Sequence, residues 1–273
     1  MLPKSNVHSH TTFSDGKNSA EEMIQTAIQR GFVSLGFSDH GYAPFELWSM
    51  SLEQEARYRR EIPLLAQKYA SQIEIAMGYE HDYHMPETDL SPYDYVIESV
   101  HMFHRQGEYA PIDESPASLQ GAIDQLFMGD PYIMCSDYFN TLCLSIMDTP
   151  AQIIGHVGLI TKFNEGNRMF NAEDRRYLRP AREALRLAVE RDLLVEVNTG
   201  AVARGYCSTP YPGKTLLKNL CEMGGRVILT SDCHSAETID FAFDSALELI
   251  RASGFKEVWG YAHGDFQPYS IVE

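Results

Sequence analysis

The sequence predicts an α/β protein of the (β/α) barrel class, with seven or eight strands. Short apolar runs of strand length alternate with amphipathic helical segments along the chain. The chain has 273 residues, 44% of them hydrophobic, which is enough for one large domain with a buried core. We therefore expect a single domain over residues 1–273. Polar clusters follow the strands, at the end where the loops of a barrel build one site.

The first predicted helix spans residues 19–30. Ser19 followed by Glu22 is typical of a capping box, and Met23 and Ala27 recur at helical spacing until Gly31 ends the helix. The same periodicity predicts further helices at 52–70, 118–128, 172–190, 215–223 and 236–252.

A buried strand is predicted directly after the first helix, at residues 33–37. Comparable apolar runs predict strands at 73–77, 95–100, 153–156, 193–197 and 227–229, and a short last strand near 258–260. A strand before His8 begins the series. No repeat, low-complexity tract or evident linker interrupts the alternation.

Histidines and carboxylates recur where the predicted strands end. The clusters are His8-Ser9-His10 with Asp15, Asp39-His40, Glu80, His101, His156 and Asp232-Cys233-His234. A single histidine after a strand is more often an ordinary hydrogen-bonded residue than a ligand. Recurrence at the same place of successive βα units indicates instead one divalent metal site assembled from distant segments.

Charge and cysteine usage narrow the class of protein. The formal net charge of −16 disfavours binding to nucleic acid or to a membrane surface, since both are polyanionic. Five cysteines without a Cys-x-x-Cys pair favour reduced thiols in the cytoplasm. No apolar leader stands at residues 1–7, and no apolar run approaches eighteen residues. We expect a cytoplasmic protein, and the oligomeric state stays open.

The order and spacing of these motifs resemble those of the polymerase and histidinol phosphatase (PHP) superfamily. The resemblance rests on His8-Ser9-His10-Thr11 with Ser14-Asp15-Gly16, Ser38-Asp39-His40, Gly78-Tyr79-Glu80, Ser99-Val100-His101, Gly155-His156 and Ser231-Asp232-Cys233-His234, and it covers residues 7–234. Residues 195–200, Arg204-Gly205 and Tyr211-Pro212 resemble the strand-six motif and phosphate loop of the stand-alone histidinol-phosphatase branch.

That resemblance implies a distorted seven-stranded TIM-like barrel and two or three divalent transition metals. Zinc, iron and manganese suit imidazole and carboxylate ligands alike. The implied first metal is held by His8, His10, Glu80 and Asp232, and Glu80 bridges to a second metal held by His101 and His156. The implied third metal is held by Asp15, His40 and His234, and some relatives have a histidine at the Asp15 position.

Metals in this set would supply hydroxide for attack on phosphorus and polarise the phosphate oxygens. Arg204 is expected to bind a phosphate oxygen of the substrate, although a solvated loop cation is the alternative. Asp39 or His234 is a candidate proton donor to the leaving alkoxide. The alternative for Asp39 is a carboxylate that orients His40.

The implied activity is hydrolysis of L-histidinol phosphate to L-histidinol and phosphate, a step of histidine biosynthesis. A phosphoesterase of another small phosphate ester, such as a nucleotide or a sugar phosphate, is the alternative. A noncatalytic or proofreading module bound to a polymerase is disfavoured by the complete ligand set.

The remaining histidines are expected outside the ligand set. We interpret His81 and His84 as loop residues, and His104 and His263 as surface or substrate-adjacent residues. Cys233 should point away from its ligand neighbours because side chains alternate along a strand. The aromatic segments 42–48 and 102–109 are the expected specificity region, although packing is the commoner role of aromatic residues.

Overall fold

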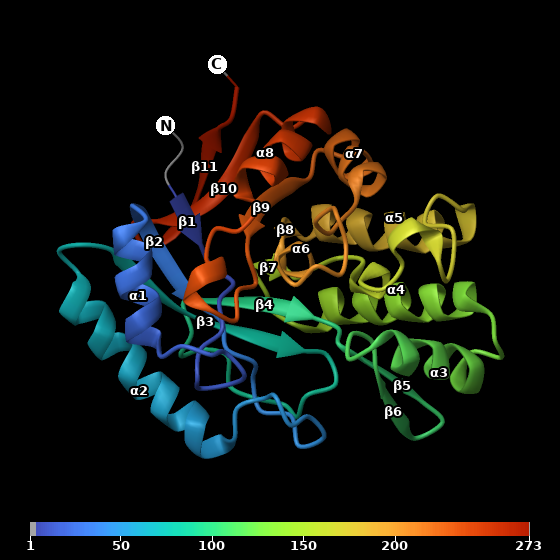
Figure 1. Ribbon diagram of the computed structural model, residues 1–273, viewed down its shortest axis with the longest axis horizontal. Coiled ribbons are helices and arrows are strands. Elements are labelled where there is room, and N and C mark those ends of the chain that lie inside the picture. The colour runs from blue at the N-terminus through green and yellow to red at the C-terminus, as the bar shows by residue number, and fades with distance from the viewer. Residues whose placement is uncertain (1–3, 273) are drawn as a thin grey trace.

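The computed structural model describes residues 4–272 and is built on one large, mostly parallel sheet (Figure 1). Eight strands run parallel, and the last one, β11, pairs antiparallel with β10. Their order in the sheet is β1 (Lys4–Asn6), β2 (Phe32–Phe37), β3 (Glu74–Asp82), β4 (Tyr95–Ser99), β7 (Ile153–Ile154), β8 (Leu194–Asn198), β9 (Arg226–Thr230), β10 (Glu257–Ala262) and β11 (Asp265–Ser270).

The two ends of this sheet meet. Ser9, beyond the end of β1, forms a parallel bridge with Cys233, beyond the end of β9, and the His10 amide donates to the Cys233 carbonyl over 2.9 Å. At the other end of β1, the Ser5 hydroxyl accepts from the Tyr261 amide of β10 over 3.1 Å. The chain segments at 8–10 and 232–234 are thereby brought together.

Helices pack around the outside of the sheet (Figure 1). They are α1 (Ala20–Gln29), α2 (Leu52–Tyr69), α3 (Pro116–Leu126), α4 (Pro131–Asp148), α5 (Arg175–Glu190), the short α6 (Gly200–Ala203), α7 (Lys214–Glu222) and α8 (Phe243–Ala252). Short 3-10 turns lie at Leu159–Thr161, Glu165–Asn167 and Ala236–Thr238. Among residues 4–272, no helix is both long and apolar enough to cross a membrane. The same residues contain no disulfide.

Inside the sheet, Tyr95 packs in an apolar cluster with Val7, Ile97 and Ile228, and its ring lies against two glycines. The Tyr95 hydroxyl donates to the carbonyl of Val7 and lies 3.1 Å from that of Phe37. A Cβ on Gly78 would lie 2.1 Å from the Tyr95 ring, and one on Gly36 would lie 2.3 Å from its hydroxyl. Glycine is therefore required at both positions, and close packing at Gly78 fixes the strand that carries Glu80.

Several predicted elements are confirmed with small shifts in their ends. The capping box of α1 is present, with the Ser19 hydroxyl accepting from the Glu22 amide over 3.3 Å. The six predicted helices correspond to α1, α2, α3, α5, α7 and α8, and the seven strands numbered above correspond to β2, β3, β4, β7, β8, β9 and β10.

Other expectations were wrong. The helix expected at 236–252 begins only at Phe243, because Ala242 has a left-handed backbone with φ 59°. The eighteen-residue α4 was not predicted, because exposed apolar residues such as Leu144 and Met147 lie outside its buried stripe and obscure the helical period. The segment 102–109 is largely a hairpin, formed by β5 (Met102–Arg105) and β6 (Glu108–Pro111).

Candidate metal centre

All nine predicted metal ligands lie together at the carboxyl ends of six parallel strands, β1, β2, β3, β4, β7 and β9. The segment after β1 carries three of them and the loop after β9 carries two, β3 carries Glu80 within the strand, and residues just after β2, β4 and β7 supply the others. The nine are His8, His10, Asp15, His40, Glu80, His101, His156, Asp232 and His234. The topology thus gathers into one cluster residues that are up to 226 positions apart.

Glu80 lies at the centre of this cluster. Its Oε2 is 3.2 Å from His8 Nε2, 3.4 Å from His10 Nε2 and 2.8 Å from His40 Nδ1. Its Oε1 is 3.0 Å from His156 Nε2 and 3.5 Å from His101 Nε2. The two oxygens of one carboxylate therefore face two different sets of imidazoles, which is the arrangement that a ligand shared by two metals requires.

The ligand atoms divide into three overlapping groups. His10, Asp15, His40 and His234 form one, His8, His10 and Asp232 form another, and His40, Glu80 and His101 form the third. Within each group the ligand atoms lie within 4.8 Å of one another. The family resemblance implied that His10 and His40 each bind one metal, whereas in the structure each of these histidines belongs to two of the three groups. His156 joins the cluster through Glu80 alone.

The cluster fits divalent cations, as its unsatisfied polar atoms indicate. His8 Nε2, both ring nitrogens of His10, His40 Nδ1 and Glu80 Oε2 are buried and have no hydrogen-bond partner among the described residues. Buried polar atoms are normally paired, and leaving one unpaired is costly. Burial, with the charges of His234 and His40, lowers the pKa of His10 to about 3. A neutral imidazole of this kind is the form that binds a metal.

Glu80 is held ionised despite its burial. Burial raises the pKa of its carboxyl, but the charges of His8, His40 and His101 and the bond to His156 hold that pKa well below its ordinary value. The Ser99 hydroxyl also donates to its Oε1 over 2.7 Å. Glu80 is thus a carboxylate with both oxygens turned toward the candidate ligands.

Two carboxylates behind the cluster were not predicted to be functional. Glu196 on β8 binds His8 Nδ1 over 2.5 Å, accepts from the His156 amide over 2.5 Å and from the Thr230 hydroxyl over 2.6 Å. Asp82 accepts from the His101 amide over 2.6 Å, and its Oδ2 lies 3.3 Å from His101 Nδ1. Carboxylates in this position orient a ligating imidazole and fix its tautomer.

The sequence contained a signal for each of these two carboxylates. Asp82 stands two residues after Glu80, and alternate residues of a strand face the same side. Glu196 is a charged residue within the apolar predicted strand 193–197, where a buried carboxylate needs a partner. Neither signal predicts which histidine each carboxylate contacts, because the two residues of each pair belong to different strands or the loops after them.

Asp39 is bound to the turn that carries Asp15. Its buried carboxylate accepts from the Thr11 amide over 2.8 Å and hydroxyl over 2.9 Å, and from the Ser14 hydroxyl over 2.6 Å and amide over 3.1 Å. These four bonds occupy the carboxylate and fix the turn that carries Asp15. This geometry does not favour Asp39 as a proton donor or as the residue that orients His40.

Arg204 lies beside the cluster, as the phosphate-binding expectation requires. It is the C-cap of α6, and its Nη2 lies 3.2 Å from Asp232 Oδ2 and its Nη1 lies 3.2 Å from His234 Nδ1. A Cβ at Gly200 would lie 2.8 Å from Asp232 and 2.9 Å from Arg204. The glycine therefore makes room for the guanidinium against the ligand carboxylate.

His234 has both ring nitrogens engaged. Its Nε2 lies 3.1 Å from Asp15 Oδ2, and its Nδ1 lies 3.1 Å from the Asp232 carbonyl. If Nε2 is a ligand, the proton resides on Nδ1 and points to that carbonyl. This geometry does not favour His234 as the proton donor to an alkoxide.

Aromatic rings surround the open side of the cluster. The Trp48 ring meets His40 edge-on at 4.2 Å between centroids and lies 5.3 Å from His101. Phe45 stacks on Tyr109 at 4.4 Å, and His104 stacks on the same Tyr109 at 4.3 Å. The two predicted aromatic segments thus lie together and border the ligands.

The other singled-out residues lie outside the ligand groups. His81 is on β3 and not in a loop, and it pairs with Glu98 over 2.7 Å. His84 lies in the following turn, as expected, and His263 is exposed. Cys233 is buried in an apolar cluster with residues of α1 and β2, which confirms its predicted orientation.

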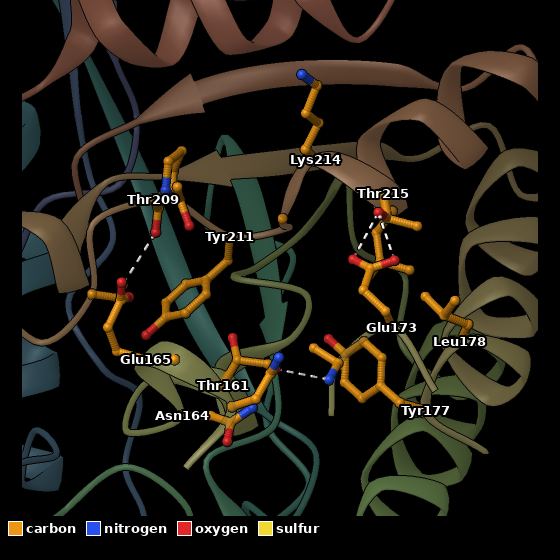
Figure 2. Close-up of a pocket in the computed structure, with 17 residues that line it drawn as sticks. Thr161, Asn164, Glu165, Glu173, Tyr177, Leu178, Thr209, Tyr211, Lys214 and Thr215 are labelled. Atoms are coloured by element: carbon orange, nitrogen blue, oxygen red, sulfur yellow. Dashed lines mark hydrogen bonds between the residues drawn. The ribbon is translucent and has the colours of Figure 1, made fainter. Parts of the chain in front are cut away.

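A separate pocket of about 230 Å³ lies beside the loop that follows Arg204. Figure 2 shows Tyr211 entering it from the loop, with Glu173 and Thr215 joined on the opposite wall. None of the nine candidate ligands lines it. It is therefore distinct from the metal centre.

Comparison with known proteins places the chain in a family. The family pattern of the PHP domain matches residues 6–200. A Deinococcus radiodurans protein named "Probable histidinol-phosphatase" is 28% identical over 96% of this chain and 97% of its own length. A solved Listeria monocytogenes structure, proposed to be a histidinol phosphatase, has a TM-score of 0.79 at 22% identity over 89% of this chain and 99% of that one.

A second solved structure carries ligands. Histidinol phosphate phosphatase of Lactococcus lactis, complexed with zinc, L-histidinol and phosphate, has a TM-score of 0.70 at 21% identity, over 98% of this chain and all of that one. Both structural similarities confirm the predicted fold class.

Proposed function

Because this chain belongs to the PHP domain family, we propose that it is a metal-dependent phosphomonoesterase that converts L-histidinol phosphate to L-histidinol and phosphate. The observation that carries this proposal is the convergence of eight imidazoles and carboxylates around Glu80, with Arg204 at their edge. Support for the substrate comes from relatives named histidinol-phosphatase over nearly the full chain and from the Lactococcus lactis complex.

The residues that would hold two or three divalent metals are the nine candidate ligands. Glu80 would bridge the sites, since its two oxygens face different imidazoles. Bound metals would supply a Lewis acid for the phosphate oxygens and hydroxide at neutral pH. Zinc, manganese and iron all suit this ligand set.

The role of Arg204 follows from the proton on His234. When His234 Nε2 is a ligand, Nδ1 carries a proton, so the contact with Arg204 Nη1 at 3.2 Å is no longer a favourable hydrogen bond. The guanidinium stays anchored through Nη2 on Asp232 while Nη1 is free to bind an anion. Arg204 would thus hold a phosphate oxygen and offset the negative charge that grows in the transition state.

Glu196 and Asp82 prepare the site before the substrate arrives. Their bonds to His8 and His101 hold each ring in a single orientation, so little reorganisation is needed on binding. The four bonds that Asp39 accepts do the same for the turn before Asp15.

The proposal is tested by assaying metal-analysed protein against a panel of phosphate monoesters. We expect two or three transition metals per chain in protein prepared without chelator, and a higher kcat/KM for L-histidinol phosphate than for nucleotides and sugar phosphates. Less than one metal per chain contradicts the metal centre. Equal kcat/KM across the panel removes the substrate assignment and leaves a general phosphoesterase.

A further inference from the structure

Glu46 belongs to the loop that joins β2 to α2 and borders the metal centre. The loop is fixed at its end, because the Met50 amide donates to the His40 carbonyl over 3.0 Å. Within it, the Ser49 hydroxyl bonds to the carbonyls of Ala43 and Glu46, each over 3.0 Å. Trp48 of the same loop packs against His40 and His101. The backbone around Glu46 is therefore held in place beside the candidate ligands.

The carboxyl group of Glu46 is buried and lacks a partner. The residue is 8% exposed, and neither of its side-chain oxygens has a hydrogen-bond partner within residues 4–272. Burial, together with the negative charge of Asp82, raises its pKa to about 9. An unpaired buried carboxyl destabilises the folded protein, so its position there favours a compensating ligand.

The surroundings of Glu46 indicate the charge of that ligand. After burial, the groups that act on its carboxyl are Asp82, His101, Asp113 and Glu80, three of which are acidic. Arg204, by contrast, binds Asp232 and contacts His234. Arg204 thus offers a cation for phosphate beside its partner Asp232. The unpaired Glu46 lies instead among groups that are mostly acidic, of which Asp113 is paired with Lys162 over 2.8 Å.

We propose that Glu46 binds the ammonium group on the leaving alcohol of the substrate. This inference rests on the proposed phosphatase function and concerns how the same site selects the alcohol. With the phosphate held by Arg204, the rest of the ester would extend toward the loop that carries Glu46 and the aromatic rings of Trp48 and Phe45. A charge-assisted hydrogen bond to an ammonium group satisfies the carboxylate.

The test compares esters that differ only by an amino group. Two pairs serve: L-histidinol phosphate with its analogue lacking the amine, and O-phosphoethanolamine with ethyl phosphate. In Glu46→Gln, kcat/KM for each amine-bearing ester should fall by roughly 10- to 100-fold, the range for a hydrogen bond to a charged group. The amine-free partners should change little, and the Ki of L-histidinol should rise while that of inorganic phosphate stays constant.

Glu53→Gln is the matched control, because it makes the same substitution at an exposed position at the start of α2. It should leave both pairs unchanged, and Glu46→Asp should restore part of the preference for the amine. An equal loss on amine-free esters in Glu46→Gln overturns the proposal and points to a role common to all monoesters, such as proton donation.

The wild-type enzyme separates this inference from the substrate assignment. If the wild-type enzyme prefers neither ester in either pair, Glu46 does not bind the amino group and the inference is wrong. If it prefers O-phosphoethanolamine to ethyl phosphate but does not favour L-histidinol phosphate over other amine-bearing esters, the substrate assignment fails while the role of Glu46 stands.

Discussion

The candidate metal centre has two regions that differ in burial and in the hydrogen bonds that hold their side chains. The inner region consists of His8, Glu80 and His156, whose side chains are at most 2% exposed. The outer region consists of Asp15, His40 and His234, and the side chains of Asp15 and His234 are 31% and 22% exposed. Both regions share imidazole and carboxylate chemistry, so the difference lies in their support.

The hydrogen bonds that hold the candidate ligands are more numerous in the inner region than in the outer region. Glu196 holds both His8 and the backbone of His156, and Ser99 donates to Glu80. In the outer region Asp15 Oδ2 is 3.1 Å from His234 Nε2, but Asp15 Oδ1 is 3.9 Å from both His40 and His10. We infer that the inner region binds its metal more tightly and that the outer region, with Arg204 beside it, adapts to the substrate.

Replacing the shared carboxylate should have the largest effect. Glu80→Gln removes the charge on which five imidazoles converge, so metal content and activity should fall together, with kcat reduced by more than about 100-fold. The far-ultraviolet circular dichroism spectrum should stay unchanged. Elemental analysis and turnover measure the two losses, and wild-type turnover in this variant would contradict the bridge.

Removing the anion-binding cation should separate phosphate binding from metal binding. Arg204→Ala should lower kcat/KM for L-histidinol phosphate by about 1.5 to 3 kcal/mol and raise KM, with metal content unchanged. Arg226→Ala is the control, because Arg226 lies at the other end of β9 and binds Asp192. A loss of metal in Arg204→Ala would show that this arginine supports the ligands and not the substrate.

The support of the inner region is tested by a matched pair of buried glutamates. Glu196→Gln should weaken metal retention or activity by about 10- to 100-fold, because the His8 ring loses its orienting carboxylate. Glu98→Gln changes an equally buried glutamate whose partner, His81, is less buried and is not a candidate ligand. Metal loss during dialysis against a chelator measures both variants, and equal loss in the two would refute the orienting role of Glu196.

The smallest effect is expected in the outer region. Asp15→Asn should remove about one metal per chain, with activity lowered by about 10-fold, the low end for a disturbed metal site. Excess metal in the assay should restore most of that activity, because the inner ligands are untouched. If added metal restores Glu80→Gln as well as it restores Asp15→Asn, the two regions do not differ in firmness.

The sequence by itself determined the fold class and which candidate ligands come together. Both depend on local features, namely strand-length apolar runs and the polar residues that directly follow them. Since parallel strands end on one face, their position in the chain was enough to bring His8, Glu80 and Asp232 together. The capping box at Ser19 and Glu22 is equally local, and it formed as predicted.

Only the tertiary structure decided which polar groups meet. Glu196 pairs with His8, Asp82 with His101, and Asp39 with the Thr11–Ser14 turn across different strands, and no spacing in the chain encodes those partners. The lack of a hydrogen-bond partner for the Glu46 carboxyl among residues 4–272 is likewise a property of the folded loop. Helix α4 was missed because helix prediction needs an apolar stripe, whereas its apolar residues extend from the buried Phe139 to the exposed Leu144 and Met147. Hydrogen bonds and packing depend on distances between segments, and those distances exist only once the sheet has brought its two ends together.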